Sequence, residues 1–161
     1  MNARADLALT GDRARERRAE SGLPLGTSQF YVLTCVQYLR DRVRDGSATV
    51  GDLDSSAIEE ILWAVRGLAI AARTTGFNAY GCMCLHLAEQ IADLQRNSRI
   101  SRSTLDLLGA WAEHSERYLR HPSEPAVVTA FIAQLNHPEW GSPFGEMEQD
   151  ILSVALLSDS A

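Results

Sequence analysis

The chain contains no lysine, and all fifteen of its basic residues are arginine. It therefore has no side-chain amine for Schiff-base chemistry and no compact ammonium group to hold a phosphate. The net charge of −6 argues against nucleic acid as the main partner, because phosphate backbones are bound by basic surfaces. No apolar run approaches the roughly 18 residues that a membrane-spanning helix needs, so we expect no membrane association.

Cysteine is also scarce, with only Cys35, Cys82 and Cys84. The N-terminal stretch MNARADLALTGDRARERRAE lacks the apolar core of a secretory signal, so we expect a cytoplasmic protein without disulfides. Cys82 and Cys84 are two positions apart on a predicted helix, which points their thiols to different sides. Adding His86 would give at most two ligands for one metal, so we expect no metal and no cofactor. Small buried hydrophobes are the expected role of these cysteines.

A length of 161 residues with 45% apolar content suits one soluble globular domain. Residues 1–27 are rich in Arg, Glu, Ala and Gly, and their apolar spacing is poor. We expect them to form a disordered tail, with an arginine-rich arm for an acidic partner as the alternative. Residues 28–158 are the predicted domain.

Apolar residues recur at helical spacing through this domain, and no stretch alternates as a strand does. Long helices are expected near residues 29–44, 57–75, 78–96 and 102–120, followed by short ones at 125–135 and 146–157. Asp45–Gly46–Ser47 should end the first helix, Ser56 and Glu59 should form a capping box for the second, and Gly76 should close it. Short connections favour antiparallel neighbours, so the predicted fold is all-α: an up-and-down four-helix bundle with one or two short C-terminal helices.

One side of the 57–75 helix is not explained by core packing. It carries, at spacings of three and four, Glu59, Trp63, Arg66, Ile70 and Arg73. Exposed apolar groups ringed by charge often mark a docking surface. The alternative is that Trp63 packs against the last helix.

The stretch RGLAIAARTTGF at 66–77, followed by HLAE at 86–89, resembles the core of a histidine phosphotransfer (HPt) domain. The resemblance covers roughly residues 28–120 and is greatest to the phosphotransfer domain of chemotaxis histidine kinases. That family reads His-x-Leu-Lys/Ala-Gly-x-Ala-x-Thr-x-Gly-Phe at the first stretch. Here Arg66 stands at the phospho-accepting histidine, Ala69 at the position that is often Lys, and Ile70 at the Gly that lets a partner approach.

Arginine stays protonated and cannot accept a phosphoryl group at neutral pH. The resemblance therefore implies a pseudo-HPt protein, not an enzyme, with a regulatory role in a bacterial two-component phosphorelay. Its expected partner is a response-regulator receiver domain or a histidine kinase. The residues expected to bind it are Trp63, Arg66, Ile70, Arg73, His86 and Glu89. In the family the carboxylate at the position of Glu89 accepts a hydrogen bond from the reactive histidine, so here we expect an Arg66–Glu89 ion pair.

Two alternatives remain open. His86, with Glu89 one turn on, would be the phospho-acceptor of an active phosphotransfer protein, although a structural histidine at a helix interface is the favoured interpretation. The other alternative is a structural subunit of a larger assembly, including a homodimer that buries Trp63. No Ser-His-Asp pattern, phosphate-cradling glycine loop or HExxH motif supports other catalysis. The acidic last helix argues against membrane-surface binding.

Overall fold

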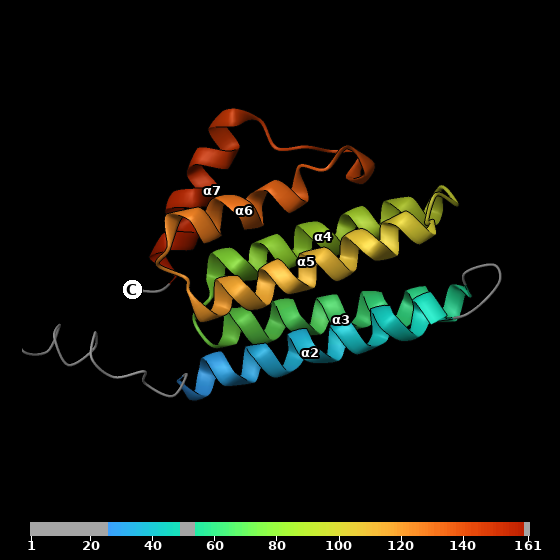
Figure 1. Cartoon of the computed structure of the whole chain (residues 1–161), viewed down its shortest axis with the longest axis horizontal. Helices are drawn as coiled ribbons and strands as arrows, with labels where there is room; N and C mark the ends of the chain where they lie inside the picture. Colours follow the sequence, from blue (N-terminus) through green and yellow to red (C-terminus); the bar gives the residue numbers. More distant parts are fainter. Residues whose placement is uncertain (1–25, 49–53, 160–161) are drawn as a thin grey trace, which may run out of the picture.

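The computed structural model describes residues 26–48 and 54–159, and all regular structure within them is helical. The long helices α2 (Thr27–Ala48), α3 (Ser55–Thr74), α4 (Asn78–Arg96) and α5 (Arg102–Arg120) lie side by side and alternate in direction (Figure 1). The predicted all-α class is confirmed. The tail prediction falls almost entirely on residues 1–25, which lie outside the described residues.

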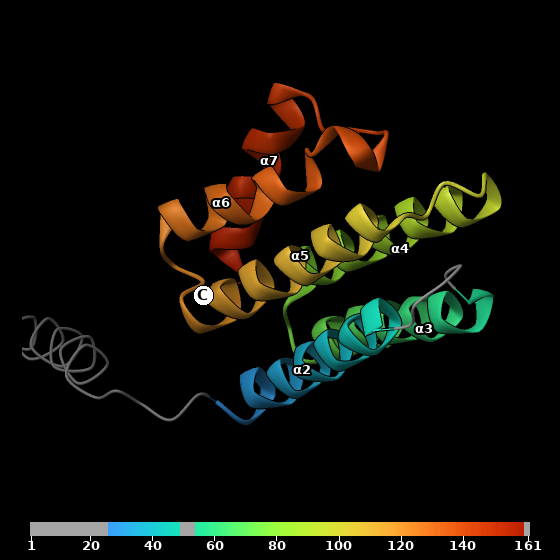
Figure 2. The same ribbon diagram turned by 45° about the vertical axis from the view of Figure 1, so that its right-hand side comes forward.

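The later elements cover the side of α4 and α5 that faces away from α2 and α3 (Figure 2). They are α6 (Pro125–Leu135), the short 3-10 helix η1 (Pro138–Trp140) and α7 (Glu146–Ser158). α6 packs on α5, and α7 packs on both α6 and α4. The two faces of the molecule are therefore different: one is formed by α2 and α3, the other by α6 and α7.

The prediction that α2 ends at Asp45–Gly46–Ser47 was wrong, because the helix continues to Ala48. Gly46 is buried, and a Cβ added there would lie 3.7 Å from Ile61 and 3.9 Å from Leu105. Packing between α2 and its neighbours at this point outweighs the poor helix propensity of glycine, which is about 1 kcal/mol.

The ends of α3 show one wrong prediction and one confirmed one. Asp54, not Ser56, is the N-cap, and its carboxylate accepts a hydrogen bond from the backbone N–H of Ser56 at 3.1 Å. At the other end Gly76 takes the left-handed conformation with φ of 93°, as predicted. The N–H of Phe77 donates to the carbonyl of Ala72 at 2.9 Å, which completes a Schellman motif.

An aromatic cluster fills the space between α4, α5 and α6. Neighbouring rings lie 5.3–6.3 Å apart between centroids, and the cluster consists of Tyr80, Trp111, Tyr118 and Phe131. The Tyr80 hydroxyl is hydrogen-bonded to Ser115, and burial raises the pKa of Tyr80 well above its usual value. This cluster packs α4, α5 and α6 together.

Two long-range contacts fasten α7 to the rest of the fold. The carboxylate of Asp159, at the end of α7, accepts hydrogen bonds from the backbone N–H groups of Ala79 at 3.0 Å and Tyr80 at 2.8 Å. α4 has no side-chain cap at its own N-cap residue, so Asp159 satisfies its first turn from a distant part of the chain. The Tyr118 hydroxyl donates to the carbonyl of Leu156 at 2.8 Å.

Candidate docking surface

The unexplained side of α3 is exposed, as predicted. Trp63 is 75% exposed and Ile70 is 65% exposed, and Arg66 and Arg73 on the same side are exposed as well. The alternative in which Trp63 packs against the last helix was wrong, because α7 packs on α4 and α6. Trp63 and Ile70 lie seven residues apart, so they form one line along the helix, which we call the α3 ridge.

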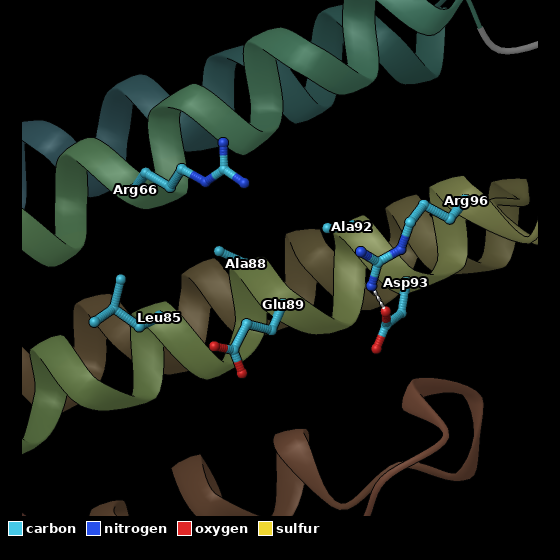
Figure 3. Close-up of a pocket in the computed structure, with 7 residues that line it drawn as sticks. All are labelled: Arg66, Leu85, Ala88, Glu89, Ala92, Asp93 and Arg96. Carbon is cyan, nitrogen blue, oxygen red and sulfur yellow. Dashed lines mark hydrogen bonds and ion pairs between the residues drawn. The ribbon is translucent and has the colours of Figure 1, made fainter.

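A charged groove of about 530 Å³ lies between α3 and α4, beside this ridge. Its lining consists of Arg66, Leu85, Ala88, Glu89, Ala92, Asp93 and Arg96 (Figure 3). The predicted Arg66–Glu89 ion pair is absent: Glu89 points away from α3, and no acidic side chain within the described residues pairs with Arg66. Asp93 and Arg96 pair with each other across one turn of α4. Of the two arginines that line this groove, Arg96 is therefore paired, and Arg66 has no acidic partner among the described residues.

α3 and α4 approach closely at Gly81, and this approach sets where Arg73 lies. A Cβ added to Gly81 would lie 2.5 Å from Cγ of Arg73 and 3.2 Å from the carbonyl oxygen of Ala69. The alkyl stem of Arg73 thus packs over the Gly81 backbone, although Arg73 as a whole is exposed. The small residue in α4 lets the arginine lie along the helix crossing.

A second groove, of about 510 Å³, runs between α2 and α3 on the other side of the ridge. Its walls are aromatic and its floor is made of small or buried residues: Tyr31, Thr34, Cys35, Tyr38, Trp63, Ala64, Gly67 and Leu68. Tyr31 and Tyr38 are exposed, and the guanidinium of Arg42 lies 5.3 Å from the centre of the Tyr38 ring. The sequence analysis did not identify these α2 tyrosines as part of the surface.

His86 does not join the α3 residues. Its ring lies 4.5 Å from that of Phe144, in the segment before α7, and its Nε2 atom is buried without a hydrogen-bond partner among the described residues. Burial lowers the pKa of His86, although Glu89 and Glu148 partly oppose that shift. This environment agrees with the favoured interpretation of a structural histidine at a helix interface.

The three cysteines are free thiols in three environments. Cys84 is buried, Cys35 is half-buried and Cys82 is exposed, so the expected burial is confirmed for Cys84 and wrong for Cys82. Burial raises the pKa of Cys84, which keeps it a neutral thiol inside the core.

The described residues contain no group of three or more His, Cys, Asp and Glu side chains placed to hold a metal ion. Among the same residues, no helix is long and apolar enough to cross a membrane. The surface features are thus two grooves, one charged and one aromatic, on either side of the α3 ridge. Comparison with protein-family models, curated proteins and solved structures finds no significant match to this chain.

Proposed function

We propose that this chain is a non-catalytic binding protein of the pseudo-HPt type, in which α2 to α5 form an HPt-like four-helix bundle and α6 and α7 extend it. It docks a receiver domain or a histidine kinase of a two-component pathway through the exposed side of α3. One observation carries the proposal: Arg66, at the position of the phospho-acceptor, is exposed and has no ion-pair partner among the described residues. It stands between the exposed side chains of Trp63 and Ile70.

The chemistry of this surface suits an acidic site with an apolar rim. A guanidinium presents five N–H donors in a planar fork and can hold a carboxylate with two parallel hydrogen bonds. Because Arg66 pairs with no acidic side chain of the described residues, binding an acidic pocket breaks no existing ion pair there. Tryptophan and arginine are also the residue types that most often dominate binding energy at protein interfaces. A receiver domain, which takes its phosphate in an acidic pocket, has the complementary charge.

The same proposal assigns no phosphoryl transfer to His86. A phospho-accepting imidazole has to present a ring nitrogen to the donor, and Nε2 of His86 is buried beside Phe144. Phosphoryl transfer to this atom would require the segment that carries Phe144 to move away. Incubation with a phosphorylated receiver should therefore leave no acid-labile label on Nε2 of His86.

The test uses Trp63 as its own reporter, because Trp111 and Trp140, the other two tryptophans, are buried. Candidate receiver domains and kinases from the source cell are titrated while iodide quenching of tryptophan fluorescence is measured. We expect binding to protect Trp63, and Arg66→Ala to weaken affinity at least tenfold, which corresponds to about 1.4 kcal/mol. The matched control is Arg99→Ala, an exposed arginine in the turn between α4 and α5.

Two results would contradict the proposal. One is binding that Arg66→Ala and Arg99→Ala weaken equally, which would place the contact away from α3. The other is the absence of binding to every receiver and kinase tested. Acid-labile label that disappears in His86→Ala would instead establish phosphotransfer through that histidine.

A further inference from the structure

The outer face of α7 carries an apolar line that nothing in the described residues covers. Met147 is 77% exposed, Ile151 is 63% exposed and Val154 is 67% exposed. Their spacing of four and three places them on one side of the helix, while Leu156 on the other side is buried in the core. We call this line the α7 ridge. Three large apolar side chains in one row are a patch, not scattered surface hydrophobes.

Acidic side chains accompany the α7 ridge. Glu146 and Asp150 are exposed beside it, and neither has a basic partner among the described residues. The helix itself contains no basic residue. Glu148 is exposed on the other edge, where its carboxylate accepts a hydrogen bond from the N–H of Gly145. The α7 face is therefore apolar along its centre and acidic along both edges.

The α2–α3 face has the complementary character. Its aromatic groove is apolar, and beyond the Trp63 wall stand Arg66 and Arg73, exposed and without acidic partners among the described residues. Glu59 is exposed on the same side of α3, so these three residues together carry one net positive charge. The lengths also agree: Tyr31 and Tyr38 on one wall, like Met147 and Val154 on the α7 ridge, are seven residues apart, or about 10 Å along a helix.

The two complementary faces belong to opposite sides of the molecule. α4 and α5 separate α7 from α2 and α3 in both views (Figures 1 and 2). One chain therefore cannot bring its own α7 ridge to its own groove. We propose that the α7 ridge of one copy seats in the α2–α3 groove of a second copy, so that the chain assembles head to tail.

The charges act at the edge of this contact and not inside the groove. Arg66 and Arg73 stand on the α4 side of the Trp63 wall, where Arg66 lines the charged groove and the stem of Arg73 packs over Gly81. Opposite charges at the edge of an interface attract over roughly a Debye length, about 8–10 Å, without forming ion pairs. The charges therefore favour approach of the acidic α7 face to this side of the molecule, and the aromatic groove holds the α7 ridge.

A contact between two different surfaces leaves one surface free at each end of the assembly. Such contacts produce rings when the rotation between copies closes and open chains when it does not. A symmetric dimer, in contrast, uses the same patch on both copies and stops at two. The inference does not depend on the proposed function, but the two are connected, because a partner on Trp63 and the next copy compete for the same side chain.

The first test uses two complementary variants of the full chain. The groove variant combines Trp63→Ser with Tyr31→Ser, and the ridge variant combines Ile151→Ser with Val154→Ser. All four side chains are exposed, so circular dichroism and the melting temperature should confirm that both variants fold. Analytical ultracentrifugation then measures the molar mass of each chain over a wide range of concentration.

We expect the mass of the natural chain to rise with concentration beyond that of a dimer, while each variant alone stays a monomer. An equimolar mixture should form a one-to-one dimer and stop there, because one intact ridge meets one intact groove. A natural chain that is monomeric at every concentration would overturn the inference. So would a mixture that stays monomeric although the natural chain assembles, because that result indicates a symmetric contact.

The second test addresses charge. Arg66→Glu with Arg73→Glu should weaken assembly at least tenfold, and adding Glu146→Arg with Asp150→Arg in the same chain should restore it to within about threefold, since the two faces then have opposite charges again. Higher salt should weaken assembly of both the natural and the charge-reversed chain. Failure of the fourfold variant to recover, with its fold intact, would refute the charge complementarity between the two faces.

Discussion

The close crossing of α3 and α4 leads to a sharp expectation for Gly81→Ala. In an exposed helix interior, exchanging Gly for Ala stabilises a protein by about 0.5–1 kcal/mol, because alanine restricts the unfolded chain and favours the helix. At Gly81 the added methyl would stand 2.5 Å from Cγ of Arg73 and 3.2 Å from the Ala69 carbonyl oxygen. Overpacking of this kind costs about 1–3 kcal/mol.

Gly109, inside α5, is the matched control, because an added Cβ there meets nothing within 4 Å. Gly109→Ala should therefore raise the free energy of unfolding by about 0.5–1 kcal/mol. The two variants share the same propensity gain, so their difference isolates the overpacking cost of about 1–3 kcal/mol. For a chain of this size that corresponds to a difference in melting temperature of about 2–12 °C.

The assay is urea unfolding followed by circular dichroism, with unchanged m-values as the sign of two-state behaviour. A double-mutant cycle with Arg73→Ala then identifies the neighbour that gives way. Removing the Arg73 stem should remove most of the cost, leaving only the tight approach to the Ala69 carbonyl. A Gly81→Ala chain as stable as Gly109→Ala would refute the close crossing, and a cost unchanged in the Arg73→Ala background would refute the role of Arg73.

Three further expectations concern groups that are buried or act at long range. Asp159→Ala should lower the free energy of unfolding by about 1–2 kcal/mol, because it removes the acceptor for the first turn of α4. Asp159→Asn should lower the free energy of unfolding by less, because its amide oxygen can still accept a hydrogen bond. Tyr80→Phe should cost about 1–3 kcal/mol by leaving the buried Ser115 hydroxyl without its partner, and adding Ser115→Ala should recover part of the loss in urea unfolding. Because burial lowers the pKa of His86, the unfolded chain binds the proton more readily, so stability should fall as the pH drops below about 6.5. His86→Leu should flatten that fall in melting temperature between pH 7.5 and 5.5. An equal slope in the natural and His86→Leu chains would refute the buried environment of His86.

Several of the helix boundaries that the sequence predicted well have strong local signals. Ser101 caps α5, Pro125 opens α6 and Gly76 closes α3, and each of these depends on only a few neighbouring residues. The end of α2 could not be predicted in this way, because Gly46 is helical through packing against α3 and α5. Asp54 and Ser56 are both good caps by residue type, so the sequence alone did not distinguish them.

The candidate surface was predicted only as far as helical periodicity reaches. The spacing of Trp63 and Ile70 identified the exposed side of α3 correctly. The same criterion would have found Tyr31 and Tyr38, which lie outside the buried stripe of α2. Helical periodicity could not test the predicted Arg66–Glu89 pair, because an ion pair between two helices depends on the directions of both side chains. In the structure Glu89 points away from α3. The burial of His86 depends on Phe144, which is distant in the chain.

Asp159 links the stability of the fold to the proposed assembly. It lies outside both contact surfaces, yet with the bond from Tyr118 to Leu156 it holds the C-terminal half of α7 against α4 and α5. A ridge of three side chains binds well only if its helix is already ordered, because ordering it on contact costs free energy. Asp159→Ala should therefore weaken head-to-tail association at least fivefold and speed amide hydrogen exchange in α7, while α2 and α3 exchange as in the natural chain. If exchange in α7 accelerates but the association constant stays the same, the α7 ridge is not the surface that the second copy binds.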